Sequence, residues 1–367
     1  MQTKYDYLIV GSGLFGSTCA FLLKNKGYKV LVIDKRNHIG GNIYTELKDN
    51  IHIHKYGPHI FHTNKKEVWD FVNKFDNFEQ FQNEPIANFN GELYNLPFNM
   101  HTFYQVYGIK TIEELEKHIE IWDKEINEPK NLEEFAIKKL GKEIYQKLVK
   151  EYTEKQWGIS CDKLPCEILG RLPIRKEWNN NYFSDLYQGI PEHGYTHIIE
   201  KMLSGVDVIL NREFDIKNDY NNFNKIIYCG SLDELFNYSI GTLEYRSLNF
   251  FEEKTQKSIG IPVMNFTSNK EGYTRIIEHK RFLKKTKDNI DNIITYEYPE
   301  QWTPLKERYY PISNETNIDL YQKYFTLLKD KYPNIIPGGR LGLYEYLNMD
   351  KIIEKAFELI NVIIIGV

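Results

Sequence analysis

Four histidines lie within the stretch "IHIHKYGPHIFHT" at positions 51–63. An imidazole can ligate a metal ion, transfer a proton or orient a neighbouring group, so this spacing allows a zinc cluster, a catalytic base or a less direct role. Isoleucines alternate with the first two histidines, which is typical of a β-strand that presents both imidazoles on one face. The four residues are His52, His54, His59 and His62.

Length and composition are those of an ordinary globular protein. A chain of 367 residues is too long for a single small core, so its length predicts two or three domains. The net charge of −4 favours neither a nucleic-acid partner nor a basic membrane-binding face. The longest apolar run is far shorter than the roughly 20 residues of a membrane span. The four cysteines form no C-x-x-C pair, and the chain opens without a signal-like segment, so we expect a reducing, cytoplasmic environment.

The N-terminal segment has the pattern of a βαβ unit. Residues 5–10 and 30–33 are short apolar runs typical of buried strands, and a helical pattern through Leu23 separates them. The turn after the first strand, "GSGLFG", matches G-x-G-x-x-G, and Asp34 follows the second strand directly. In this context the motif predicts a bound dinucleotide rather than a purely structural turn.

Each part of this motif has a physical role in dinucleotide binding. Gly11 permits the tight turn, Gly13 lets the backbone approach a pyrophosphate, and Gly16 allows helix and strand to pack closely. The helix N-terminus offers N–H donors, and Asp34 can accept hydrogen bonds from a ribose. The following "DKRNHIGGN" resembles the glutathione-reductase-type flavoproteins, which bind FAD. Only one G-x-G-x-x-G occurs in the chain, which argues against a separate NAD(P)H domain.

The spacing of apolar residues changes twice along the rest of the chain. Around residues 131–152, apolar residues recur at helical spacing, with Asn131 as an expected N-cap and Glu134 three positions later, so we expect residues of about 100–175 to be mostly helical. From about 235 to 310, short aromatic and β-branched runs predict an antiparallel sheet. The segment "NIIPGGRLGLYEYLNMDKIIEKAFELI" predicts a strand, a glycine-rich turn and an amphipathic helix. We expect this βα unit to join the first domain, which is then discontinuous.

Arginine is scarce, with nine among 47 basic residues. A forked, bidentate donor is therefore expected where a diphosphate must be held. Candidates are Arg171, Arg275 and Arg340, although a surface salt bridge is an alternative for each. Tyrosines lie beside the last two arginines, namely Tyr273, Tyr344 and Tyr346. The residues alone thus indicate an FAD protein with a second anionic ligand, such as a sugar nucleotide.

Nine segments follow one another in the order found in bacterial UDP-galactopyranose mutases, and the chain resembles this family over residues 3–360. The segments are "YDYLIVGSGLFG", "DKRNHIGGN", "HKYGPHIFHT", "NLPFN", "YTEKQWG", "LPIR", "NNNYFSDLYQGIP", "GYTRIIEHK" and "GGRLGLYEYLNMD". The resemblance implies an α/β fold, in which a Rossmann-like FAD-binding domain of the glutathione-reductase type carries an inserted helical bundle and a twisted antiparallel β-sheet domain. The active site is expected in the cleft between these domains.

The resemblance also implies domain boundaries. The discontinuous FAD-binding domain is expected to comprise residues 1–80, 193–230 and 333–367. The helical domain with its mobile lid is expected at 100–175. The sheet domain is expected at 81–99, 176–192 and 231–332.

The implied activity is an isomerisation without net redox change. UDP-galactopyranose and UDP-galactofuranose interconvert in this family through a covalent sugar adduct at N5 of reduced FAD. Some relatives act on UDP-arabinopyranose, UDP-N-acetylgalactosamine or dTDP-fucose derivatives, so the sugar stays open. Two alternatives come from other classes, an FAD-dependent oxidoreductase and a non-catalytic nucleotide-sugar binding protein.

Matching the motifs residue by residue gives the expected roles. The residues expected to hold FAD are Gly11, Gly13, Phe15, Gly16, Asp34, Lys35, Gly41, Asn42, His59, Ile60, Phe214, Arg340, Asn348 and Met349. Those expected to contact the substrate are Asn83, Thr153, Trp157, Arg171, Tyr182, Asn265, Arg275, Tyr310 and Tyr346. Catalytic roles are expected for Arg171, Arg275, His59 and His62. The two arginines neutralise the substrate diphosphate, and Arg171 belongs to the mobile lid.

The resemblance also bears on the histidines. It places His59 and His62 in a loop against the flavin, where they orient and polarise, so no metal site is expected. His52 and His54 are expected to be hydrogen-bonded or solvated. One departure is Asn348, where the family usually has aspartate, so a negative charge near the cofactor is lost. The implied protein is a cytoplasmic homodimer that takes a UDP-sugar and a flavin reductant such as NAD(P)H, without nucleic-acid or membrane partners.

Overall fold

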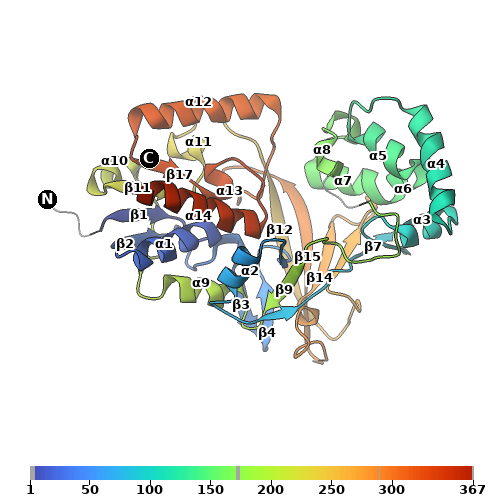
Figure 1. The fold of residues 1–367 in the computed structure, drawn as a ribbon, viewed down its shortest axis with the longest axis horizontal. Coiled ribbons are helices and arrows are strands. Elements are labelled where there is room, and N and C mark those ends of the chain that lie inside the picture. Colours follow the sequence, from blue (N-terminus) through green and yellow to red (C-terminus); the bar gives the residue numbers. More distant parts are fainter. Residues whose placement is uncertain (1–4, 171–173, 289, 366–367) are drawn as a thin grey trace.

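A five-stranded parallel sheet forms one end of the molecule in the computed structural model, which describes residues 5–170, 174–288 and 290–365 (Figure 1). Its central strands are almost entirely apolar, because helices cover both faces. In sheet order the strands are β10 (Asp207–Ile209), β2 (Val30–Ile33), β1 (Tyr7–Val10), β11 (Lys225–Tyr228) and β17 (Ile335–Pro337). The helices of this part are α1 (Leu14–Asn25), α2 (Lys66–Val72), α9 (Tyr195–Leu203), α10 (Ile216–Asp219), α11 (Leu232–Leu235), α12 (Glu315–Lys331), α13 (Gly339–Gly342) and α14 (Met349–Ile365).

This sheet contains the βαβ unit that the sequence predicts. β1 and β2 are parallel neighbours, and α1 joins them. Alternate side chains of a strand point to opposite faces. Tyr7 and Ile9 therefore pack in one core with α1, α9 and α14, while Leu8 packs in another with α11 and α12. β17 pairs with β11, which confirms that the C-terminal βα unit joins the first sheet.

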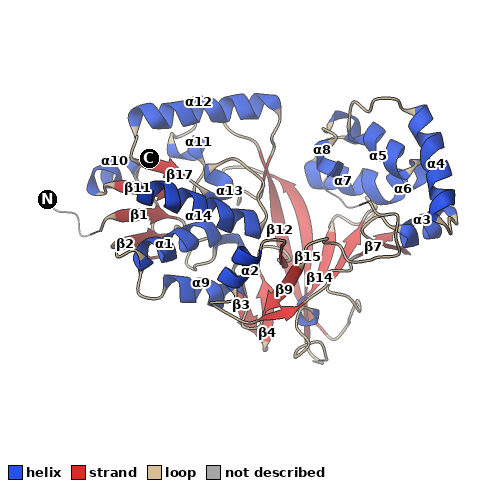
Figure 2. Ribbon diagram, in the orientation of Figure 1, coloured by secondary structure: helices blue, strands red, loops and turns tan. Residues whose placement is uncertain are grey.

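A seven-stranded sheet lies between the parallel sheet and the helical part of the chain (Figures 1 and 2). Its neighbours are antiparallel except β13 and β7, which are parallel, so the sheet is not wholly antiparallel as predicted. Parallel neighbours require a long crossover, and here the chain between them contains the helical part. In sheet order the strands are β16 (Tyr310–Pro311), β12 (Tyr245–Thr255), β15 (Asn292–Gln301), β14 (Arg275–Glu278), β13 (Val263–Phe266), β7 (Ile86–Phe89) and β8 (Glu92–Asn95).

Helices α3–α8 form the other end of the molecule (Figure 1). Asn131 caps α5 as predicted, since its side chain accepts a hydrogen bond from the backbone N–H of Glu134. A π-helical turn links α6 to α7, and such turns are frequent at functional sites. The helices are α3 (Met100–Tyr107), α4 (Ile112–Glu125), α5 (Leu132–Leu140), α6 (Lys142–Ile144), α7 (Glu151–Trp157) and α8 (Glu167–Gly170).

Two small sheets complete the described part of the chain. They comprise β3 (Thr45–Lys48) with β4 (Ile51–His54), and β5 (Phe61–Thr63), β9 (Tyr187–Pro191) and β6 (Phe78–Gln80). His62 lies on β5 and not in the predicted loop, because β5 pairs with β9 from a distant segment. No helix within the described ranges is both long and apolar enough to cross a membrane. The domain boundaries stay a prediction.

Candidate active site

The two large sheets and the helical part line a common cavity of about 1810 Å³. Its lining includes the glycine turn after β1, residues of β13 and β14, and helix α7. Ligand sites typically measure about 300–1,000 Å³. The cavity therefore has room for a cofactor and a second ligand together.

Glycines line the cavity beside β1. Gly11 has φ +107°, and a Cβ there would lie 3.0 Å from the Cβ of Cys229. A Cβ on Gly41 would lie 2.9 Å from the Cα of Gly13. Gly13 itself has φ −68°, and among the described residues its added Cβ would meet only the Gly41 Cα, at 3.8 Å. Protein packing thus does not require glycine at position 13, where the open space at the N-terminus of α1 lets a phosphate approach the backbone.

Asp34 is buried and hydrogen-bonded to the glycine turn. Its Oδ2 accepts from the backbone N–H and the hydroxyl of Ser12, at 2.7 and 2.6 Å. Its Oδ1 accepts from the backbone N–H of Arg36 at 2.9 Å. A carboxylate has about four acceptor positions, so roughly one is left for a ribose hydroxyl. Asp34 therefore fixes the turn in addition to offering the acceptor that the sequence predicts.

Two arginines bring unpaired donors to the cavity. Arg36 forms a salt bridge with Glu307 at 2.7 Å and lies 4.6 Å from the centre of the Tyr56 ring, but its buried Nη1 has no hydrogen-bond partner among the described residues. The buried Nε and Nη2 of Arg340 also lack a partner within that part of the chain, and its guanidinium lies 4.7 Å from the Tyr346 ring. Buried donors without partners are costly, so these atoms indicate a ligand with acceptor groups.

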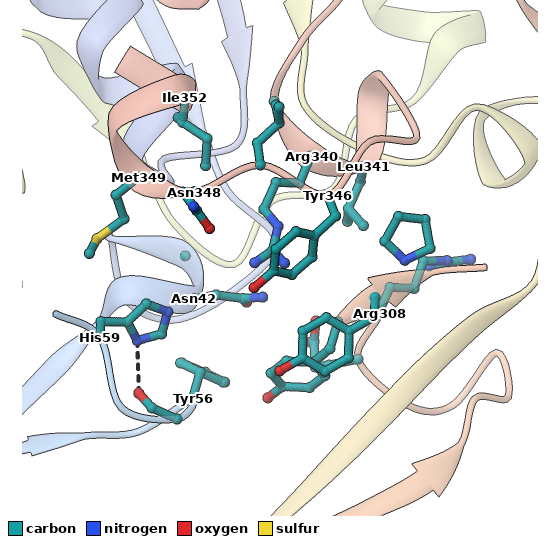
Figure 3. A pocket seen from close by; sticks show the side chains of 18 of the residues that line it. Asn42, Tyr56, His59, Arg308, Arg340, Leu341, Tyr346, Asn348, Met349 and Ile352 are labelled. Atoms are coloured by element: carbon teal, nitrogen blue, oxygen red, sulfur yellow. Dashed lines mark hydrogen bonds between the residues drawn. The ribbon is translucent and has the colours of Figure 1, made fainter. Parts of the chain in front are cut away.

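These features together fit a flavin nucleotide. The glycine turn suits a pyrophosphate, Asp34 keeps an acceptor position, and the arginines supply donors. Figure 3 shows the side chains of Asn42, His59 and Asn348 around the same space as Arg340. The structure thus brings together Asn42 and Asn348, which lie 306 positions apart in the sequence (348 − 42).

His59 lies in the loop between β4 and β5 and has a neutral ring. Its Nδ1 is 2.7 Å from the carbonyl oxygen of Gly57 (Figure 3), so Nδ1 carries the proton and Nε2 is an acceptor. Burial lowers the pKa of His59 to about 4, and the positive charges of Arg340 and Arg275 act in the same direction. His59 can therefore orient a ligand by accepting a hydrogen bond.

Two buried histidines support the loop that carries His59. The Nδ1 of His54 accepts from the backbone N–H of His59 at 3.1 Å, and its ring stacks on Phe282. The Nδ1 of His279 accepts from the backbone N–H of His54 at 3.3 Å, and its Nε2 lies 2.7 Å from the Thr295 hydroxyl. Burial lowers the pKa of both rings, to about 3 for His279. The prediction that His54 is hydrogen-bonded is confirmed.

His62 faces the cavity from β5. Its Nδ1 lies 2.7 Å from the Oδ2 of Asp185, and its ring stacks on Phe183 with the centroids 3.8 Å apart. Asp185 also accepts from the Asn64 side chain at 2.7 Å. These contacts fix the ring plane and direct the other nitrogen of His62 away from the carboxylate.

Arg275, at the start of β14, is a cation on the part of the cavity wall that the seven-stranded sheet forms. Its Nε donates to the hydroxyl of Tyr152 at 3.1 Å and lies 3.5 Å from the Oε1 of Glu297 on β15. Burial alone would lower the pKa of Arg275, but Glu297, Tyr152 and Tyr310 together outweigh this effect, and the pKa lies well above its usual value. Burial raises the pKa of Tyr152, Tyr182 and Tyr310, so their hydroxyls stay protonated. A fixed cation among hydroxyl donors suits a phosphate ligand.

Every predicted site residue that the structure describes lines this cavity. The residues predicted to hold the cofactor are Gly11, Gly13, Phe15, Gly16, Asp34, Lys35, Gly41, Asn42, His59, Ile60, Phe214, Arg340, Asn348 and Met349. Those predicted on the substrate side are His62, Asn83, Thr153, Trp157, Tyr182, Asn265, Arg275, Tyr310 and Tyr346. Arg171 lies outside the described residues. The individual roles stay predictions.

Two tyrosines that the sequence places beside arginines do not belong to this lining. Tyr344 is buried, and its hydroxyl donates to the Glu244 carbonyl at 2.7 Å. Tyr273 packs edge-on against Phe266, at 4.8 Å. Both were candidates only because they are near an arginine in sequence. Tyr344 belongs to the protein core instead, and the half-buried Tyr273 packs against neighbouring aromatic rings.

Three other residues line the cavity but were not predicted from the sequence. Tyr152 immediately precedes the predicted Thr153 in "YTEKQWG", so its position in α7 was the available signal. Glu297 lies in the strand segment "IITYEYPEQ", where nothing in the local pattern marks its pairing with Arg275. Arg36 belongs to the quoted "DKRNHIGGN", but its unpaired donor becomes evident only in three dimensions.

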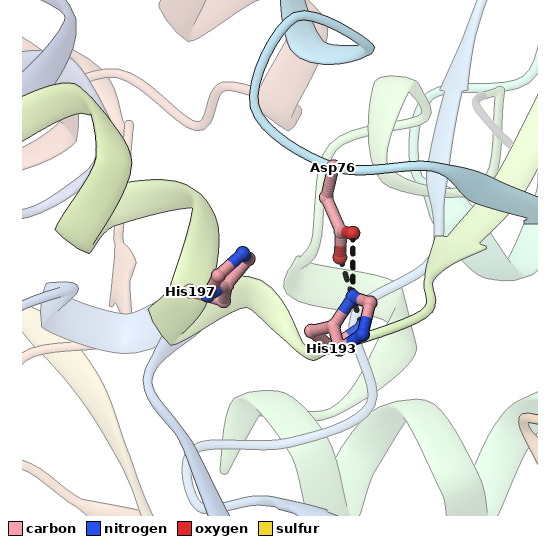
Figure 4. A group of neighbouring side chains, drawn as sticks. All are labelled: Asp76, His193 and His197. Carbon is pink, nitrogen blue, oxygen red and sulfur yellow. Dashed lines mark hydrogen bonds and ion pairs between the residues drawn. The ribbon is translucent and has the colours of Figure 1, made fainter.

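A separate group of metal-type side chains lies near the start of α9, outside the cavity lining (Figure 4). Asp76, His193 and His197 each place a donor atom within 4.8 Å of the others. The Asp76 carboxylate accepts from the backbone N–H of Asn77 and from the backbone N–H and Nδ1 of His193, at 2.8–2.9 Å. These hydrogen bonds account for the grouping, because the Asp76 carboxylate fixes the backbone that leads into α9. His52 lies nearby, and burial lowers its pKa to about 4.

Known proteins resemble this chain over nearly its whole length. A profile described as UDP-galactopyranose mutase matches residues 147–346, and one described as an NAD(P)-binding Rossmann-like domain matches residues 9–75. A probable UDP-galactopyranose mutase of Klebsiella pneumoniae is 37% identical over 361 residues, which cover 96% of this chain and 93% of that protein. A dTDP-fucopyranose mutase of Escherichia coli is 34% identical over 368 residues, which cover 96% of each.

A solved structure has the same fold. A reduced UDP-galactopyranose mutase superposes with a TM-score of 0.78 at 15% identity, and the match covers 99% of this chain and 96% of that one. The α/β fold with a Rossmann-like domain is therefore confirmed. On the family profile and the relatives together, this chain belongs to the UDP-galactopyranose mutase family of isomerases.

Proposed function

We propose that this chain interconverts the pyranose and furanose forms of a nucleotide-linked sugar, with UDP-galactose as the first candidate. The observation that carries the proposal is the continuity of one cavity, which runs from the glycine turn to the Arg275 cluster. The cavity volume of about 1810 Å³ accommodates both a dinucleotide and a nucleotide sugar. The relatives that are named as mutases support the same assignment.

The cofactor that these residues fit is FAD. Gly11 and Gly13, at the N-terminus of α1, would hold the pyrophosphate, and Asp34 would accept from a ribose hydroxyl. The unpaired donors of Arg340 would bind acceptor atoms of the bound cofactor or of the substrate beside it. Reduced FAD supplies, at its N5, a nucleophile for the anomeric carbon of the sugar, and no net redox change results.

The wall opposite the cofactor would hold the substrate diphosphate. Arg275 would neutralise it, and the hydroxyls of Tyr310 and Tyr346 would donate to its oxygens. Trp157 would lie along the nucleotide, with Asn83, Thr153, Tyr182 and Asn265 as further contacts. A firm hold on UDP matters because the nucleotide must leave the sugar and then return to it in each cycle. Arg171 is proposed as the second cation, on sequence resemblance alone.

The two imidazoles at the cavity would orient and polarise groups. Nε2 of His59 would accept a hydrogen bond, since Nδ1 is committed to Gly57. His62 would present its outer nitrogen from a ring that Asp185 fixes. Neither proposal requires a charged imidazole, which agrees with the lowered pKa of His59.

Two sugars are suggested by the names of the relatives. UDP-galactose comes first because the relative with 37% identity is a probable UDP-galactopyranose mutase. A dTDP-fucose substrate is the second candidate, from the relative with 34% identity. UDP-arabinopyranose and UDP-N-acetylgalactosamine complete the panel. We also propose a cytoplasmic homodimer whose flavin is reduced by a donor such as NAD(P)H, on family resemblance alone.

The test is turnover in the reduced state. Dithionite-reduced protein, held without oxygen, is given each of the four nucleotide sugars, and the products are separated by HPLC. We expect a furanose product from at least one sugar, and none before reduction. An oxidoreductase would instead bleach its oxidised flavin when substrate is added without dithionite. Failure to form a furanose from any of the four sugars would refute the proposed function.

A further inference from the structure

Helix α7 and the strands β13 and β14 carry substrate-facing side chains on two different parts of the fold. Thr153 and Trp157 line the cavity from α7, while Asn265 and Arg275 line it from β13 and β14. The loop 267–274 connects these two strands. A substrate that touches both sides needs α7 and this loop at a fixed separation.

Lys155 on α7 makes the most extensive hydrogen-bonded contact between these two parts. Its ammonium group lies within hydrogen-bond distance of four backbone carbonyl oxygens. One belongs to Phe266 at the end of β13, at 2.9 Å, and three belong to the loop: Ser268 at 2.5 Å, Glu271 at 3.2 Å and Tyr273 at 3.1 Å. An ammonium group has three N–H donors and no acceptor, so it can satisfy a ring of carbonyls that converge on one point. Without it, four carbonyl dipoles would face one another across an empty centre.

Further contacts fix the same junction. The backbone N–H of Asn269, in the loop, donates to the Oε2 of Glu151 at 2.5 Å, so the first turn of α7 also binds the loop. Burial lowers the pKa of Lys155 to about 8, while the charges of Glu271 and Glu151 favour its ammonium form. The lysine thus keeps an interior position at a cost in solvation, which the four carbonyls offset.

Arg246 on β12 holds the other end of α7. Its Nε donates to the carbonyl of Gln156 at 2.8 Å, and its Nη2 donates to that of Lys155 at 3.2 Å. Its Nη1 donates to Gln301 on β15 at 2.9 Å. The last carbonyls of a helix need such partners, and a cation near this end also interacts favourably with the helix dipole. α7 is therefore tied to the large sheet at several points, and among them Lys155 binds four carbonyl groups at once beside Arg275.

We propose that Lys155 is a positioning residue for the reaction, whose ammonium group locks α7 to the loop 267–274 and so fixes the two substrate-binding walls relative to each other. This inference rests on the proposed function, because only a ligand that bridges both walls requires their separation to be fixed. Lys155 does not line the cavity in the described part of the chain, so it acts through Trp157, Thr153 and Arg275.

The test compares Lys155→Met with Lys150→Met in the reduced holoenzyme. Methionine is unbranched and only one atom shorter than lysine, but it offers no N–H donor. Lys150 makes no hydrogen bond or ion pair through its side chain within the described residues. Misplacement by about 1 Å can cost about 100-fold in rate. We therefore expect kcat/KM for UDP-galactopyranose to fall by about 100-fold in Lys155→Met, and the Kd for UDP to rise by about tenfold. Lys150→Met should stay within about twofold of the wild type.

Hydrogen exchange separates positioning from a general loss of stability. In Lys155→Met the amides of residues 151–157 and 267–274 should exchange faster, while those of the parallel sheet and the flavin content stay unchanged. Lys155→Gln, which retains two N–H donors on a shorter side chain, should recover part of the UDP affinity. A Lys155→Met enzyme with wild-type kinetics would overturn the inference. Failure of both Lys155→Met and Lys155→Gln to fold would also overturn the inference, because a residue that only positions two elements is not needed for folding.

Failure of the proposed function gives a different result. In that case the wild type itself neither forms a furanose nor binds UDP. A wild type that turns over and binds UDP, beside a Lys155→Met variant that does so equally well, contradicts only the positioning role.

Discussion

The guanidinium of Arg275 and the carboxylate of Glu297 form an ion pair on neighbouring strands, with 3.5 Å between Nε and Oε1. Among the described residues, both polar contacts of Arg275, to Glu297 and to Tyr152, are made by its Nε. Its two Nη groups make no hydrogen bond or ion pair within the described ranges, and Arg275 lines the cavity. This arrangement suits bidentate recognition of a phosphate, which a lysine cannot reproduce.

Replacement of Glu297 by Gln should weaken this fork. Glutamine keeps the shape of the side chain but removes the charge that holds Arg275, and loss of one partner of a buried charge pair typically costs 2–5 kcal/mol. We expect kcat/KM of the reduced enzyme to fall by about 100-fold. Glu300→Gln is the matched control, because Glu300 lies on the same strand but pairs with Lys306 at the surface. Equal kinetics for the two variants would contradict the role of Glu297.

Replacement of Arg275 by Lys tests the fork itself. Lysine retains the positive charge, but it offers a single point of contact in place of two parallel donors. We expect UDP affinity to fall by about tenfold or more, measured by titration of the reduced protein with UDP. An affinity within about twofold of the wild type would mean that charge alone, and not the fork, binds the diphosphate.

Replacement of Gly13 by Ala should separate cofactor binding from folding. The protein leaves room for this Cβ, since the nearest described atom is 3.8 Å away, whereas a Cβ on Gly16 would lie 2.0 Å from the Gly11 carbonyl oxygen. Gly13→Ala should therefore unfold at a normal temperature as the apoprotein but bind FAD weakly, because the methyl group occupies the approach of the pyrophosphate. Gly16→Ala should lose both properties. The ratio of flavin to protein absorbance and a thermal melt measure the two effects.

The buried histidines should make the protein sensitive to acid. The pKa of His279 is about 3 in the folded chain against an ordinary 6.5, so between these values the unfolded chain binds a proton that the folded chain does not. The free energy of unfolding should therefore fall as pH falls, by about 2 kcal/mol between pH 7 and 5 for this residue.

Urea unfolding of the wild type and of His279→Gln at both pH values checks this expectation. The variant should be less stable at pH 7 but should lose about 2 kcal/mol less on acidification. His118→Gln, at a half-buried position on α4, is the control and should retain the full wild-type dependence. A His279→Gln variant with the wild-type slope would contradict the assignment of the neutral ring.

Asn348→Asp should change the flavin rather than the fold. Position 348 precedes α14 and lines the cavity, and either side chain is suitable at a helix N-terminus. A negative charge near the isoalloxazine disfavours the electron-rich reduced form, so the midpoint potential should fall. A dye-coupled reductive titration measures it, with Asn348→Gln as the uncharged control. A potential that rises or stays constant in Asn348→Asp would show that this side chain lies too far from the ring.

Local features of the site could be predicted from the sequence. The glycine turn, the acid after β2 and the N-cap of α5 each depend on residues within a few positions of one another, so spacing alone carries the information. The resemblance then supplied residues from the remote segments. The structure brings all of those it describes to one cavity.

Contacts between distant segments could not be predicted in this way. The parallel pair of β7 and β13, the Arg275–Glu297 ion pair and the carbonyl ring around Lys155 join segments that are 22 to 178 residues apart. The local spacing of apolar residues contains no information about which distant segments pair. Proximity in sequence also gave two wrong candidates, Tyr273 and Tyr344. Their side chains pack against other groups and not beside the neighbouring arginines.

The most direct measurement is turnover of UDP-galactopyranose by the purified protein before and after reduction with dithionite. We predict a flavin spectrum, no furanose from the oxidised enzyme and rapid approach to a pyranose–furanose equilibrium from the reduced enzyme. A colourless protein that cannot be reconstituted with FAD, or a furanose yield that does not depend on reduction, would contradict the account.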